Sequence, residues 1–139
     1  MAALAVPLLL AGCADLVTPI DRPTTAAPTS VRITMSTSGV HGPVYLQGMI
    51  RFVRITGEGP DTQANIQKEL EVDGDTRVKL PAGGVYQIAS WARPCGKTCD
   101  TLHRPVGRCS TSFTAPAGQV TTIEIRASMR RDCSITVSG

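Results

Sequence analysis

The sequence predicts an all-β protein, an antiparallel β-sandwich of about seven or eight strands that is braced by disulfide bonds. Three observations predict this fold class. From Val31 onward, apolar and polar residues alternate with period two, which is the pattern of half-buried strands. Clusters of Gly, Pro and Asp separate these alternating runs at short intervals. No window of the sequence shows a convincing apolar period of 3.6 residues, so no amphipathic helix is expected.

The second alternating run changes its apolar face part of the way along. Leu46, Ile50 and Phe52 share one face, and the apolar phase then slips by one residue to Val53 and Ile55. A slip of one residue turns a strand over. We therefore expect a β-bulge or a bend near Phe52.

Two further runs flank the Asp-Gly-Asp sequence of residues 73–75. Ile66 and Leu70 alternate with polar residues before it, and Val78 and Leu80 do so after it. A tight Asp-Gly turn between two alternating runs is typical of a β-hairpin. We expect these two strands to pair with each other.

Turns of similar composition lead into two later strands. Residues 80–85 (LPAGGV) lead into a strand through Trp91, and residues 115–120 (APAGQV) lead into one through Ile125. The last strand begins at Cys133. Trp91 is interpreted either as a ligand-stacking residue or as a partly buried part of the core.

The N-terminal residues have the pattern expected of a targeting signal. Residues 2–11 are almost entirely apolar, but this run is too short to span a membrane, which takes roughly 20 apolar residues. It ends in residues 10–13 (LAGC), which resemble the lipobox of bacterial lipoproteins. The resemblance implies that residues 1–12 are a signal peptide and that Cys13 becomes the lipidated first residue. No Lys or Arg precedes Cys13, which a start codon assigned too far downstream would explain; the alternative is a buried apolar strand or helix.

Residues 13–30 form the next predicted segment. They are rich in Pro, Thr and Ala and lack strand or helix periodicity, so we expect a lipidated cysteine followed by a semi-extended tether. Residues 31–139 are the predicted β-sandwich domain. Acyl chains on Cys13 would insert into membrane lipid, which places the protein outside the cytoplasm and anchored to the cell membrane.

Two resemblances concern the domain itself. Residues 80–91 (LPAGGVYQIASW) resemble the start of a strand in prealbumin-like (transthyretin-like) sandwiches, within the broader immunoglobulin-like architecture. The chain is also similar to small actinobacterial lipoproteins with an Arg-Pro-Cys stretch, two further cysteines and a last one near the C-terminus. In this sequence these are Cys95, Cys99, Cys109 and Cys133. The resemblance implies a fold and a location but no activity.

The four cysteines that remain after lipidation predict two disulfides, because exported thiols tend to be oxidised. Four cysteines allow three pairings. Cys109 and Cys133 each share a strand face with apolar residues, so we predict that they pair across strands inside the domain. Cys95 and Cys99 would then form a local clip within a loop.

The alternative function is an exported zinc-binding protein that uses Cys95, Cys99, His103 and Cys109. These residues have the right ligand types for a Cys3His site, although the gap after His103 is wider than in most structural zinc sites. A redox role is disfavoured because three residues, not two, separate the first two cysteines.

The sequence favours a non-enzymatic binding or structural module of the cell envelope with no cofactor. It contains no nucleophile elbow and no phosphate-cradling glycine loop. Residues 13–75 carry five basic and eight acidic side chains, and residues 76–139 carry nine basic and three acidic ones. No basic run is interleaved with aromatic residues, which argues against nucleic acid. The loop between residues 93 and 108 is the predicted binding site for a cell-envelope protein or an anionic polymer; its expected contact residues are Arg93, Lys97, His103, Arg104 and Arg108.

Overall fold

Eight strands and no helix make up the described part of the chain in this computed structural model, which covers residues 27–38, 48–57, 59, 63–71, 74–128 and 132–139. The strands are β1 (Pro28–Ser38), β2 (Met49–Gly57), β3 (Ala64–Leu70), β4 (Asp75–Pro81), β5 (Val85–Pro94), β6 (Val106–Thr114), β7 (Val120–Ser128) and β8 (Cys133–Ser138). The predicted signal peptide, Cys13 and most of the tether lie outside the described residues. The expected all-β class is confirmed.

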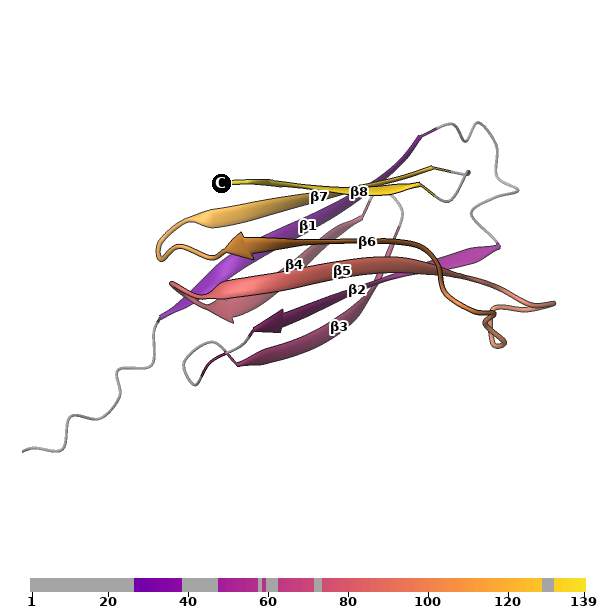
Figure 1. Cartoon of the computed structure of the whole chain (residues 1–139), viewed down its shortest axis with the longest axis horizontal. Helices are drawn as coiled ribbons and strands as arrows, with labels where there is room; N and C mark the ends of the chain where they lie inside the picture. The colour runs from indigo at the N-terminus through magenta and orange to yellow at the C-terminus, as the bar shows by residue number, and fades with distance from the viewer. Residues whose placement is uncertain (1–26, 39–47, 58, 60–62, 72–73, 129–131) are drawn as a thin grey trace, which may run out of the picture.

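The strands form two sheets of four, with the orders β4-β1-β7-β8 and β3-β2-β5-β6 (Figure 1). Five of the six neighbouring pairs are antiparallel, but β1 and β7 run parallel. The antiparallel prediction therefore needs a correction at this one pair. An alternating strand has the same apolar pattern whether its neighbour is parallel or antiparallel, so the sequence pattern could not reveal it.

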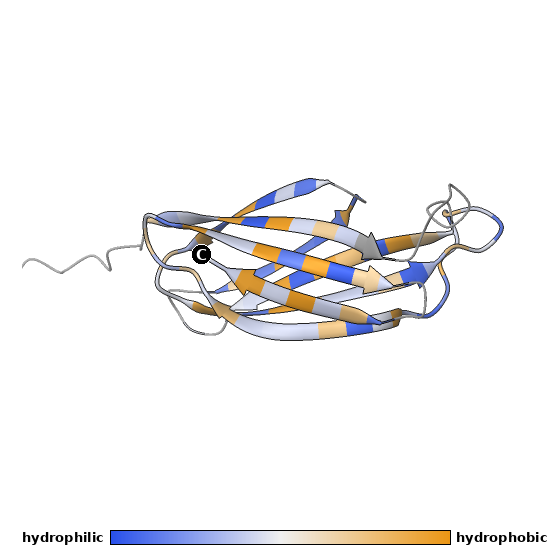
Figure 2. Ribbon diagram, turned by 90° about the horizontal axis from the view of Figure 1, so that it is seen from above, coloured by the Kyte–Doolittle hydropathy of each residue, from blue (hydrophilic) through white to orange (hydrophobic). Residues whose placement is uncertain are grey.

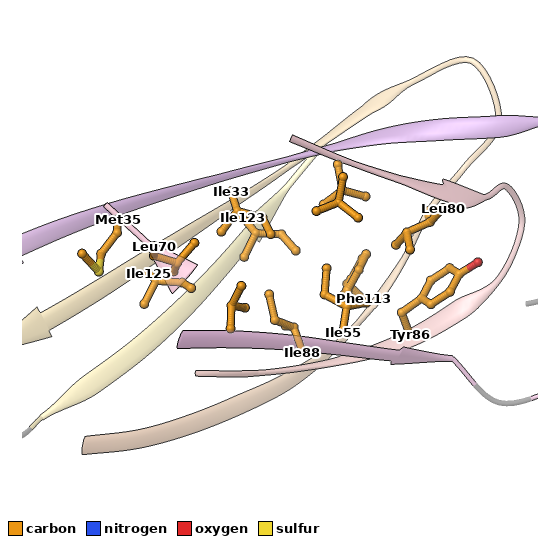
Figure 3. Packing of buried hydrophobic residues seen from close by; sticks show 14 residues of the cluster. Ile33, Met35, Ile55, Leu70, Leu80, Tyr86, Ile88, Phe113, Ile123 and Ile125 are labelled. Carbon is orange, nitrogen blue, oxygen red and sulfur yellow. The ribbon is translucent and has the colours of Figure 1, made fainter. Parts of the chain in front are cut away.

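The core lies between the two sheets and is built from alternate residues of nearly every strand (Figure 3). Figure 2 shows the same alternation as successive apolar and polar bands along the strands. The buried cluster contains mostly aliphatic side chains, namely Val31, Ile33, Met35, Val53, Ile55, Leu70, Val78, Leu80, Tyr86, Ile88, Phe113, Ala115, Ile123 and Ile125. Burial of this apolar surface is the main force that holds the two sheets together.

The first strand begins at Pro28, three residues earlier than the expected start at Val31. Its Thr29 side chain is buried, and its hydroxyl lies 2.7 Å from the carbonyl oxygen of Gln119 and 3.1 Å from that of Pro116. Such bonds to the β6–β7 turn satisfy a polar group that burial has removed from water. The end of the segment predicted as a tether therefore belongs to the sheet.

The bulge expected near Phe52 is absent. Pairing of β2 with β3 and with β5 continues without a shift through Phe52. Arg51, Val53 and Ile55 are buried, whereas Phe52 is only partly buried, so β2 keeps one inward phase. The apparent slip arose because Arg51 is a charged residue at an inward position, which disguised the true phase.

The prediction of a hairpin around residues 73–75 is also wrong. The strand before this turn, β3, pairs with β2 in one sheet, and the strand after it, β4, pairs with β1 in the other. Leu70 and Val78 are both buried in the shared core and reach it from opposite sheets. The chain therefore crosses from one layer to the other at this point.

The two ends of the sandwich carry different segments. Pro28 at the start of β1 pairs with Pro81, and the backbone N–H of Ala82 donates to the carbonyl of Ala27 at 3.2 Å. The C-terminus lies at this same end, whereas the β5–β6 loop lies at the opposite one (Figure 1). We call these the proximal and distal ends. Within the described residues, no helix is long and apolar enough to cross a bilayer.

Candidate functional site

Both predicted disulfides are present in the structure. Cys95 pairs with Cys99, with their Cα atoms 4.6 Å apart, and forms a clip at the distal end. Cys109 pairs with Cys133, with their Cα atoms 5.4 Å apart. Because Cys109 lies on β6 and Cys133 on β8, this second bond joins the edge strands of the two sheets.

The disulfides use every sulfur that the alternative zinc site would need. Cys95, Cys99 and Cys109 are all bonded to another cysteine, so zinc could bind there only after both bonds had been reduced. In the part of the chain that the structure describes, no three His, Cys, Asp or Glu side chains are grouped so as to hold a metal ion.

Backbone hydrogen bonds and Arg93 shape the β5–β6 loop. The N–H of Gly96 donates to the Thr101 carbonyl at 2.7 Å, and the N–H of His103 donates to the Pro94 carbonyl at 2.8 Å. The Arg93 guanidinium donates to the carbonyls of His103 at 2.9 Å and Leu102 at 3.0 Å. Arg93 is one of the predicted contact residues. It lies next to the end of β5 and stabilises the loop through these hydrogen bonds.

The other predicted contact residues do not form one cluster. Lys97, His103 and Arg104 are exposed on the loop. Arg108 lies on β6, beyond the loop, beside a separate hollow on the outer face of the β3-β2-β5-β6 sheet. The structure therefore divides the predicted site into the loop and this hollow.

Trp91 and Phe52 form an aromatic pair on that outer face, which the sequence reasoning missed. Their ring centroids lie 5.9 Å apart and their planes are inclined by 20°. The Arg54 guanidinium lies over the Trp91 ring, 5.5 Å from its centroid, within the range of a cation–π contact. Trp91 is therefore not a core residue. The inward phase of Val53 and Ile55 was the signal that could have placed Phe52 and Arg54 outside.

Arg51 is a buried cation at the distal end of the core. Its Nη1 atom lies 3.3 Å from each of its three partners, Ser90 Oγ, the Gly107 carbonyl and Cys133 Sγ. It forms no ion pair with any described residue. Burial lowers the pKa of its guanidinium below the usual value, although Arg remains protonated at physiological pH.

Comparisons with known proteins assign no family. No family model matches the sequence, and no curated protein matches it. Among solved structures, one described as "Crystal Structure of Gram Negative Toxin" is similar over 81% of this chain, with 12% sequence identity and a TM-score of 0.39. This chain covers 23% of that structure's length, and a likeness of this degree carries no argument about function.

Proposed function

We propose that this protein is an exported lipoprotein, anchored to the cell membrane through acylated Cys13, that acts as a non-enzymatic binding or structural module of the cell envelope. The sequence support is the lipobox-like LAGC of residues 10–13. The proposal makes the domain a rigid body that presents a surface away from the bilayer.

The observation that carries the proposal is the pair of disulfides. Structural disulfides persist in oxidising compartments and are rare where thiols are kept reduced. A sandwich with only 4% aromatic residues has few of the large rings that contribute most to burial, and covalent links compensate for a small core. Both properties are typical of small exported domains.

The positions of the two ends also support the proposal. Ala27 lies at the proximal end, so a tether that precedes it would join the domain there. The ten residues of β5 then run roughly 30 Å to the β5–β6 loop at the distal end. The loop and the outer hollow would face away from the membrane, where a partner can reach them.

We further infer that the sandwich is of the prealbumin-like kind. Residues 80–85 lead into β5. The hydroxyl of the buried Tyr86 donates a hydrogen bond to the Pro81 carbonyl at 2.6 Å. A tyrosine that bonds back to the backbone a few residues upstream is a recurrent feature of β-sandwiches.

Metabolic labelling with an alkyne-bearing fatty acid tests the anchor. The whole chain, expressed in a bacterium that processes lipoproteins, should take up the label, and Cys13→Ser should abolish it because the acceptor thiol is gone. The paired Cys95→Ser and Cys99→Ser variant is the matched control and should label like the parent chain. An unlabelled parent, or equal labelling of Cys13→Ser, would contradict the proposal.

A further inference from the structure

A hollow of about 370 Å³ opens on the outer face of the β3-β2-β5-β6 sheet toward its distal end. Its floor is low because Ala89 and Ser110, which are paired across β5 and β6, have small side chains. Larger side chains rise around it, namely Arg54, Trp91, Pro105 and Arg108.

A β-bulge in the β5–β6 pairing lies beside the hollow, opposite Trp91. Ser90 pairs with Cys109, and Ala92 pairs with Val106. Two residues of β6, Gly107 and Arg108, therefore lie opposite the single residue Trp91 of β5. One of them, Gly107, has a φ of 57°, in the left-handed region that favours glycine. Bulges of this kind redirect side chains and occur often beside functional sites. Trp91 itself has no paired residue in the β5–β6 ladder.

The hollow is bordered by two arginines that no carboxylate neutralises. Arg54 lies on β2 and Arg108 on β6, so the two flank β5 from opposite sides. Arg54 donates to the neutral Gln67 side chain at 2.7 Å. Among the described residues, neither arginine forms an ion pair, and no acidic residue lines the hollow. An anion placed there would meet two guanidinium groups, which are well suited to bind carboxylate, sulfate or phosphate.

The position of the hollow disfavours a peptide that binds by strand addition. One common way in which an extended peptide binds is by adding a strand to a sheet edge, where backbone groups are free. This hollow lies on the face of the sheet and is lined by residues of β2, β5 and the edge strand β6, whereas an added strand would lie in the plane of the sheet beside β6. A ring that packs against an indole while its anionic group meets the arginines fits this arrangement better.

We propose that this hollow binds an acidic glycan, with a sugar ring against Trp91 and the anionic group of the sugar between Arg54 and Arg108. The inference rests on the proposed function, because an exported domain is the one that meets such polymers. It gives the module a ligand class and a site of its own, separate from the exposed residues Lys97, His103 and Arg104 of the β5–β6 loop.

Trp91 is the only tryptophan in the sequence, so its fluorescence reports directly on this site. The purified whole chain, with its disulfides intact, is titrated with tetragalacturonate and with a neutral galactose tetramer of equal length. We expect tetragalacturonate to change the fluorescence and to bind at least tenfold more tightly than the neutral sugar. Arg54→Gln and Arg108→Gln should each weaken binding at least tenfold, whereas Arg77→Gln on the other sheet should leave it unchanged.

Three outcomes would overturn the proposal: failure of tetragalacturonate to bind, equal binding of the neutral sugar, or tetraglutamate or a thymidine oligonucleotide of equal charge binding as tightly. The last result would indicate a peptide or nucleic acid partner. Because this titration does not depend on the acyl chains and the labelling of Cys13 does not depend on the arginines, failure of one proposal can be distinguished from failure of the other.

Discussion

Arg51 shows how one residue can obscure a strand and still belong to the core. It occupies an inward position of β2 between the two sheets, where its guanidinium contacts Ser90, Gly107 and Cys133. Removal of a charge from water without a counter-ion is unfavourable, and the hydrogen bonds offset only part of that effect. Its volume, however, fills the core beside the inter-sheet disulfide.

We predict that Arg51→Met retains the free energy of unfolding to within about 1 kcal/mol, because an unbranched apolar chain fills much of the same space without a charge to desolvate. Arg51→Ala should lower this free energy by about 2 to 4 kcal/mol, because it leaves a cavity. Denaturant unfolding of the oxidised chain, followed by Trp91 fluorescence, measures both. Arg77→Met, at an exposed site on β4, is the control. Equal losses for Met and Ala would show that the hydrogen bonds of Arg51 matter more than its volume.

The sequence identifies inward residues well where a strand is simply amphipathic and poorly where a charged residue points inward. Val31, Ile33 and Met35 all lie in the core, in agreement with the period-two alternation that begins at Val31, because that alternation has no competing interpretation. Phe52 was misplaced because an aromatic side chain on the outer face resembles a core residue. Its true role depends on contact with Trp91 on the neighbouring strand β5, which sequence periodicity does not encode.

At the scale of the elements, the two disulfides make different connections. The Cys95–Cys99 bond closes a short segment within one loop, whereas the Cys109–Cys133 bond spans 24 positions and joins β6 to β8. Longer closed loops restrict the unfolded chain more strongly, so the second bond should contribute more to stability.

We predict that the double variant Cys109→Ser, Cys133→Ser loses roughly 3 kcal/mol of unfolding free energy and that Cys95→Ser, Cys99→Ser loses about 2 kcal/mol or less. Equilibrium unfolding in urea under non-reducing conditions gives both values. The account would be contradicted if the local clip proved the more important of the two.

The disulfide pairing could be predicted because strand parity and short separation each depend on local sequence. The topology could not. The turn at residues 73–75 resembles a hairpin turn, but β3 and β4 pair with partners that lie far away along the chain. The parallel contact of β1 with β7 likewise joins segments about 90 positions apart, as the pairing of Ser30 with Val120 shows. Register between such distant segments is set by packing of the whole core.

The whole molecule is organised along one axis. The first described residues and the C-terminus lie at the proximal end, whereas the clip and the β5–β6 loop lie at the distal end (Figure 1). The Cys109–Cys133 bond joins the edge strands of the two sheets. Under the proposed function, a tethered domain would present its β5–β6 loop and its outer hollow away from the membrane.

Intact mass of the protein extracted from membranes, alkylated without reduction, tests the proposed function most directly. The account predicts a chain that begins at a di- or triacylated Cys13 and carries no alkylated thiol, because its four other cysteines are paired. A chain that retains residues 1–12 and carries four or five alkylated cysteines would contradict export. That result would make a zinc site at Cys95, Cys99, His103 and Cys109 the hypothesis to test, by measuring zinc in protein prepared without chelator.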